Sequence, residues 1–99
     1  MAKLTLTVLN PKHVLFQGEV QSVFLPGDQG EFELLPYHAP IVSLLREGTI
    51  VIDWERQIPI RKGMVRLLNN ECVILLEEPT PPRARAAGET TVRSGGSQS

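Results

Sequence analysis

Cysteine is almost missing from this 99-residue chain, because Cys72 is the only one. A single cysteine cannot close an internal disulfide, so we expect Cys72 to be a small buried apolar residue in a reducing, cytoplasm-like compartment. No apolar stretch approaches the roughly 20 residues that span a bilayer, and the N-terminus lacks the apolar block of a signal peptide. The formal net charge is only −1. This balance disfavours nucleic acid or an anionic membrane surface as a direct partner.

Large apolar residues become scarce near position 78, where the composition changes. Proline, glycine and serine recur from there on, and Val92 is the last large aliphatic residue. Such a segment cannot bury enough apolar area to offset the cost of ordering its backbone, which is about 1 to 2 kcal/mol per residue. We therefore predict one domain over residues 1–78 and a disordered tail over residues 79–99.

Alternating apolar and polar residues are the main pattern of the first 78 positions. Leu4, Leu6 and Val8 alternate with polar residues, as in a strand with one buried face. Pro59 predicts an edge strand, since proline has no N–H to donate to a neighbour. Further extended runs lie at 19–25, 49–54, 57–62, 64–68 and 72–77, and turn residues separate them. Short strands without a convincing amphipathic helix predict an all-β fold, an antiparallel sandwich or flattened barrel.

A domain this small needs most of its large aliphatic side chains inside, where each contributes about 1.5 to 3 kcal/mol. The predicted core consists of Leu4, Leu6, Val8, Val20, Phe24, Phe32, Leu34, Ile41, Leu44, Ile50, Ile52, Val65, Leu67, Val73 and Leu75.

Groups that could carry out chemistry are few. The two histidines are 25 positions apart and follow no metal-ligand spacing, and no serine lies in the G-x-S-x-G turn of hydrolases. The loop at 26–31 contains two glycines, but the carboxylates of Asp28 and Glu31 would repel a phosphate. We expect neither a metal nor a cofactor, and no catalytic residue.

One long stretch resembles a known family. Residues 25–40 (LPGDQGEFELLPYHAP), preceded by 14–23 (VLFQGEVQSV), are similar to the N-terminal β-sandwich domain of the epsilon subunit of F-type ATP synthase. Residues 45–52, 62–65 and 69–76 resemble later parts of the same family pattern. The resemblance covers about 78 residues, with the order and the spacing in agreement.

The resemblance implies ten strands in two five-stranded sheets, and a non-catalytic role in the central stalk. In that family the domain holds the gamma subunit and rests on the polar loops of the membrane-embedded c-ring, so that the two rotate together. It implies a peripheral position at the cytoplasmic face of the bacterial inner membrane. Residues that match the ring-facing loop are Gln29, Gly30 and Glu31, with His38 close by. Candidates for contact with gamma are Phe32, Leu35 and Tyr37.

The sequence departs from the family pattern in two places. Glu33 stands where many relatives have glycine, which would change the charge of the ring-facing edge. The helical hairpin that typically follows the sandwich has no counterpart after Pro79, so we expect a subunit that couples rotation without regulating through such a hairpin.

Two other functions remain open from the residues alone. One is a free-standing β-sandwich that binds a small ligand, with Tyr37 and Trp54 as the available exposed aromatics. The other is a small hydrolase, for which the chain offers no nucleophile with a supporting base.

Overall fold

The computed structural model describes residues 2–77, and these residues form an all-β domain. Its strands are β1 (Leu4–Leu9), β2 (Val14–Val20), β3 (Val23–Gly27), β4 (Gly30–Leu34), β5 (Ile41–Leu45), β6 (Gly48–Ile52), β7 (Arg56–Ile60), β8 (Gly63–Leu68) and β9 (Glu71–Leu76). The predicted tail at 79–99 lies outside the described residues. Within 2–77, no helix is long and apolar enough to cross a membrane.

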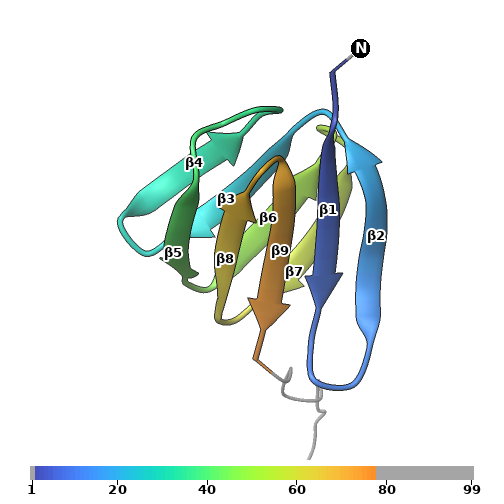
Figure 1. Cartoon of the computed structure of the whole chain (residues 1–99). Coiled ribbons are helices and arrows are strands. Elements are labelled where there is room, and N and C mark those ends of the chain that lie inside the picture. The colour runs from blue at the N-terminus through green and yellow to red at the C-terminus, as the bar shows by residue number, and fades with distance from the viewer. Residues whose placement is uncertain (1, 78–99) are drawn as a thin grey trace, which may run out of the picture.

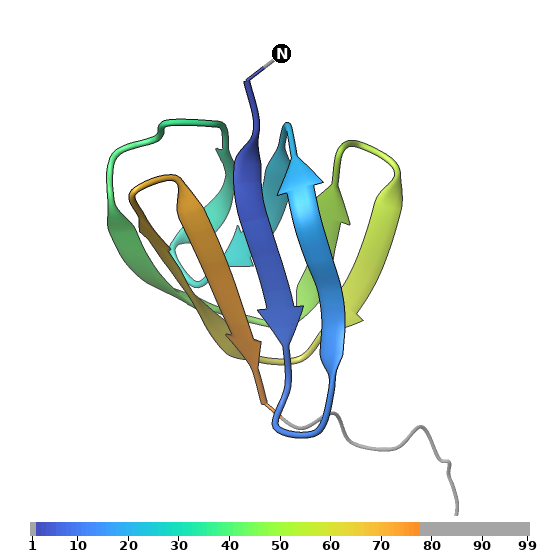
Figure 2. The same ribbon diagram turned by 45° about the vertical axis from the view of Figure 1, so that its right-hand side comes forward.

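The strands follow one hydrogen-bonded path, β2-β1-β9-β8-β5-β3-β6-β7, and β4 pairs with β3. The path is weakest between β5 and β3, which share only the pair Gly27 and Leu45. At this point the sheet curls over, so that β1, β8 and β9 stand in front of β3, β6 and β7 (Figure 1). We call β2, β1, β9, β8 and β5 the β1 layer, and β4, β3, β6 and β7 the β3 layer. Figure 2 shows how the curl brings the two layers face to face.

The prediction of an all-β domain is confirmed, but its finer detail is not. The described residues hold nine strands, joined in one curled sheet. The predicted count of ten strands, in two separate five-stranded sheets, is therefore not confirmed in this part of the chain.

Apolar side chains from both layers fill the space between them. Every residue of the buried core is aliphatic or cysteine, and Phe16, Phe32, Ile41 and Ile58 pack against it, half-buried. Nine of the predicted core residues are in the buried core: Leu4, Leu6, Val8, Val20, Leu34, Ile50, Ile52, Val65 and Leu67.

The inward face was predicted wrongly in three strands. Phe24, Leu44 and Leu75 are exposed, and Val73 is half-buried. Their chain neighbours face inward instead, and these buried residues are Val23, Leu25, Leu45, Cys72, Ile74 and Leu76. Among them, only the burial of Cys72 was predicted, and it is confirmed. Because adjacent side chains of a strand point to opposite faces, an error of one position reverses the whole assignment.

Two tight turns join neighbouring strands into antiparallel hairpins, β6 with β7 and β8 with β9. The turn between β6 and β7 contains Asp53 and Trp54, both with φ above 50°, and Asn69 and Asn70 adopt the same conformation between β8 and β9. Asparagine and aspartate tolerate this left-handed conformation better than other residues with a side chain. Pro59 lies in β7, which ends the strand path, as predicted for an edge strand.

The run predicted at 19–25 is broken into β2 and β3 by a bend at Gln21 and Ser22. The carboxylate of Asp53 accepts hydrogen bonds from the backbone N–H groups of both residues, at 2.7 and 3.2 Å. The Asp53 N–H in turn donates to the Ser22 carbonyl. The bend and the β6–β7 turn therefore support each other.

Candidate partner-binding surface

The predicted ring-facing residues lie at opposite ends of β4. Gln29 is in the turn between β3 and β4, where Gly30 has a φ of 129° that favours glycine. Glu31 follows at the start of β4 and is exposed. His38 comes after the other end of β4, and its Nδ1 lies 2.7 Å from the Ala39 carbonyl. A five-residue strand rises about 3.3 Å per residue, so His38 and Glu31 do not form one compact site.

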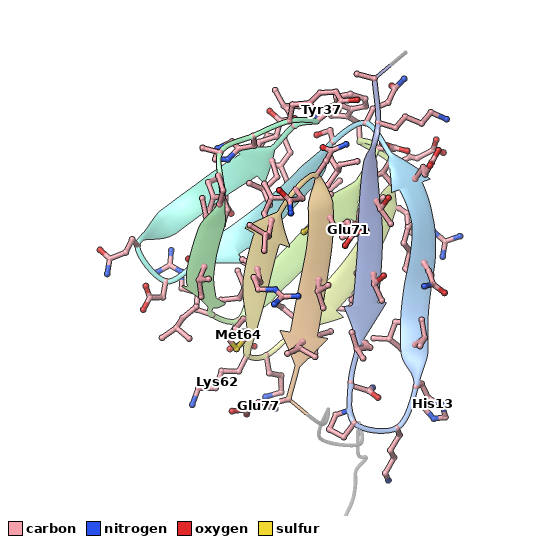
Figure 3. The ribbon with its side chains drawn as sticks, in the orientation of Figure 1. His13, Tyr37, Lys62, Met64, Glu71 and Glu77 are labelled. Carbon is pink, nitrogen blue, oxygen red and sulfur yellow. The ribbon has the colours of Figure 1, made fainter. Side chains whose placement is uncertain are left out.

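The predicted gamma-contacting residues differ in exposure. Phe32 packs against the core, whereas Leu35 is exposed and Tyr37 is the most exposed large apolar residue described, at 75%. Tyr37 has a φ of 64°, and its N–H donates to Oδ1 of Asn70 at 2.7 Å. The amide of Asn70 also donates to the Lys3 carbonyl. This asparagine therefore fixes the loop that presents Tyr37 at the upper end of the domain (Figure 3).

Within residues 2–77, neither histidine is hydrogen-bonded to the Cys72 thiol or to a serine hydroxyl. His13 lies in the loop between β1 and β2, at the end of the domain opposite Tyr37 (Figure 3). Cys72 is buried, and its burial raises the pKa of the thiol to about 12. The hydroxyl of buried Ser22 donates to the Glu33 carboxylate. Among residues 2–77, no group of three or more histidine, cysteine or acidic side chains could hold a metal ion.

The outward face of the β1 layer carries a row of apolar side chains that cross several strands. The strand register places Leu44 opposite Met64, Met64 opposite Leu75 and Leu75 opposite Leu9. Leu44, Met64 and Leu75 are 59%, 37% and 48% exposed. We call Leu9, Leu44, Met64 and Leu75 the outer apolar row. Contiguous exposed apolar surface of this kind is typical of a protein-binding site.

A shallow groove of about 580 Å³ adjoins this row at the lower end of the domain. Leu44, Met64 and Leu75 form its apolar side. Its charged lining is balanced, with Arg46, Arg61 and Lys62 against Asp28, Glu47 and Glu77. Lys62 and Glu77 approach to 3.9 Å and are well exposed (Figure 3). The groove thus extends the apolar surface without adding a net charge.

The outer apolar row was missed from the sequence, although a signal for it was present. Both Ile41–Leu45 and Cys72–Leu76 are apolar on nearly every residue, so they do not alternate as a strand with one wet face does. Such a run predicts a strand that is covered on both faces. In the isolated domain one face of each strand is exposed to solvent.

The comparisons with known proteins agree with this arrangement. The family model of the ATP synthase delta/epsilon chain β-sandwich domain matches residues 3–81. The ATP synthase epsilon chain of a Nitratiruptor species is 39% identical over 85 residues, which are 82% of this chain and 66% of that protein. The epsilon chain of Sulfurimonas denitrificans is 37% identical over 81 residues, or 78% of this chain and 62% of the relative. The chain thus spans less than two thirds of the length of these curated relatives.

Two solved structures share the fold. A chain of the Tetrahymena thermophila mitochondrial ATP synthase central stalk and c-ring aligns with a TM-score of 0.67 at 13% identity, covering 83% of this chain and 69% of that one. A chain of the Euglena gracilis mitochondrial ATP synthase aligns with a TM-score of 0.70 at 20% identity, covering 87% and 57%. The sequence match, supported by this common fold, shows that the chain belongs to the ATP synthase delta/epsilon chain β-sandwich family.

Proposed function

We propose that this chain is the epsilon subunit of the central stalk of an F-type ATP synthase. In this role it joins the gamma subunit to the c-ring, so that rotation driven by ion flow reaches the sites of ATP synthesis. It is a mechanical part, and we assign it no catalytic step. Its place would be peripheral, at the cytoplasmic face of the bacterial inner membrane, where the rest of the enzyme holds it.

The observation that carries this proposal is the outer apolar row, in a chain that belongs to the epsilon family. The row is presented by hydrogen-bonded strands of the β1 layer, not by loops. A close-packed body of this kind resists compression and transmits force. We propose that gamma covers the row, and that Leu35 and Tyr37 extend the contact at the upper end. Phe32, which packs against the core, would support this loop from below.

The c-ring contact is proposed at the β3–β4 turn. Gln29, Gly30 and exposed Glu31 lie together there and could meet a polar loop of the ring. The position of His38 beyond the other end of β4 places it with Leu35 and Tyr37. We therefore propose His38 as part of a second contact, separate from the one at Glu31.

The test is a binding measurement between the full chain and the gamma subunit of the same enzyme. Met64→Glu places a carboxylate in the middle of the outer apolar row, and we expect it to weaken binding by at least about 100-fold, since an unpaired buried charge is costly. Gln57→Glu is the matched control, because Gln57 is exposed on β7 of the other layer. Its affinity should stay within about twofold of the wild type.

Thermal unfolding of both variants checks that the domain remains folded. Absence of binding to gamma and to the c-ring by the folded wild-type chain at micromolar concentration would reject the proposed function. An unchanged affinity of Met64→Glu would reject the outer apolar row as the surface that gamma covers.

A further inference from the structure

We infer that Arg66, at the centre of the outward face of the β1 layer, binds an acidic side chain of the partner. This inference rests on the proposed function, because it concerns what the partner must present to this surface. It names a recognition residue and the chemistry that matches it: a carboxylate of gamma, set within an apolar strip.

The strand register surrounds Arg66 with apolar side chains. Val42 lies opposite it on β5, and Val73 lies opposite it on β9. Along β8 its neighbours on the same face are Met64 and Leu68, both exposed. Arg66 thus projects from the middle of an apolar surface.

Arg66 has no salt bridge, hydrogen bond or stacking partner within residues 2–77. The nearest carboxylate in the register is that of Glu71, which lies opposite Leu68, one step further along the face. No ion pair joins Glu71 to Arg66 in the described part of the chain. In the free domain, water therefore satisfies the Arg66 guanidinium.

Contact with a partner removes this water. A flat surface that covers Val42, Met64 and Val73 also covers Arg66, because the four side chains project from one face of paired strands. A guanidinium that loses water without gaining an acceptor is strongly unfavourable. The partner must therefore supply acceptors at this point, and a carboxylate fits the planar fork of arginine with two parallel hydrogen bonds.

The groove at the lower end does not offer an alternative charge contact, because its three basic and three acidic lining residues cancel. Apolar contact there can add binding area but no preference for acidic partners. Arg66 is thus the residue that would select a partner by charge, and its apolar surroundings would strengthen the pairing by excluding water.

The test compares gamma binding by the wild type, Arg66→Gln, Arg66→Lys and Arg66→Glu. We expect Arg66→Gln to weaken binding by at least about 30-fold, and Arg66→Glu by more, because one partner of a buried charge pair is lost or opposed. Arg66→Lys should fall between the wild type and Arg66→Gln, since lysine keeps the charge but not the fork. Arg56→Gln is the matched control, because this exposed arginine stacks on Phe16 at 5.5 Å and lies away from the outward face.

Salt and charge exchange give independent readouts. Raising the ionic strength from about 0.05 M to about 0.5 M should weaken wild-type binding more than Arg66→Gln binding, because salt screens the attraction between the Arg66 guanidinium and the carboxylate. Replacement of single acidic residues of gamma by lysine should identify one position that restores binding to Arg66→Glu.

The outcomes separate this inference from the proposed function. If the wild type binds gamma and Arg66→Gln binds as tightly as Arg56→Gln, the inference is overturned and the proposed function stands. A second outcome is that Arg66→Gln binds gamma more weakly than the wild type, but both lose affinity equally with salt and no lysine in gamma restores binding to Arg66→Glu. The acceptor is then neutral, and the inferred carboxylate is overturned. If the folded wild type binds the c-ring but not gamma, the inference is overturned. If it binds neither gamma nor the c-ring, the proposed function fails, and the inference fails with it.

Discussion

The outward faces of the two layers are built from strands of similar length, but their side chains differ. On the β1 layer, Leu44, Met64 and Leu75 adjoin one another across three strands. On the β3 layer, Phe24 and Val51 are also neighbours, but Glu33 and Gln57 flank them on either side. A continuous apolar row and an interrupted one have different consequences, since only the first offers an uninterrupted area to a partner.

The inward faces show no such difference. Leu4, Leu6 and Val8 of the β1 layer and Ile50 and Ile52 of the β3 layer are all within 2% of full burial. Folding demands the same aliphatic packing from both layers, whereas the outward faces are free to differ. The contrast between them therefore reports on binding more than on stability.

The largest expected effect tests whether the inner and outer faces of β9 are correctly assigned. Ile74 is fully buried and its neighbour Leu75 is half exposed. Ile74→Ala should destabilise the domain by about 2 to 5 kcal/mol through a core cavity. Leu75→Ala should cost less than about 1 kcal/mol, because it removes surface that water already contacts.

Denaturant unfolding of the two variants measures this difference. Equal losses of stability would show that the two faces of β9 are not distinct. A greater loss for Leu75→Ala would restore the assignment predicted from the sequence, in which Leu75 belongs to the core.

The positions that sequence reasoning placed wrongly are instructive. The strand at Leu4–Val8 was predicted with the correct face because its outward residues are threonines. In Cys72–Leu76 every residue is apolar, so periodicity carried no information about which face is buried. Leu44 and Leu75 were predicted as core but lie in the outer apolar row, because the buried core and this exposed row are built from the same residue types.

The site was therefore predictable in its kind but not in its place. The family resemblance implied contact with gamma and the c-ring, and the local residues around Glu31 could be named from it. Which residues share a face depends on pairing between strands far apart in sequence, such as β5 with β8 and β1 with β9. No local sequence pattern indicates that pairing, so the sequence alone could not predict that Arg66 lies at the centre of an exposed face.

Cys72 faces the core between the two layers, and the pH dependence of stability tests this position. Burial raises the pKa of its thiol from 9.0 to about 12. A raised pKa means that the folded state holds its proton more tightly than the unfolded state does. The resulting stability is complete below about pH 9 and is lost as the pH rises toward 12, at about 1.4 kcal/mol per pH unit.

Cys72→Val provides the comparison, since valine fills a similar volume without an ionisable group. Between pH 9 and 11 the wild type should lose more stability than Cys72→Val, as measured by denaturant unfolding at each pH. All other ionisable groups are common to both proteins, so their contributions cancel in the difference. Parallel pH curves would contradict the assignment of Cys72 to the space between the layers.

The smallest expected effect on stability is at Glu31, on the outward side of the β3 layer. Its carboxylate is exposed at the start of β4, so Glu31→Lys should change the free energy of unfolding by less than about 0.5 kcal/mol. The assembled ATP synthase should nevertheless show weaker coupling between ion flow and ATP turnover if this carboxylate contacts the c-ring.

Glu55→Lys is the matched control, because Glu55 is also exposed, in the β6–β7 turn at the opposite end of the domain. Coupling that is lowered by Glu31→Lys and not by Glu55→Lys would assign separate partners to the two layers, with the c-ring at the β3–β4 turn and gamma on the outer apolar row. Equal coupling in both variants would remove the β3–β4 turn from the ring contact and leave the outer apolar row as the binding surface that distinguishes the layers.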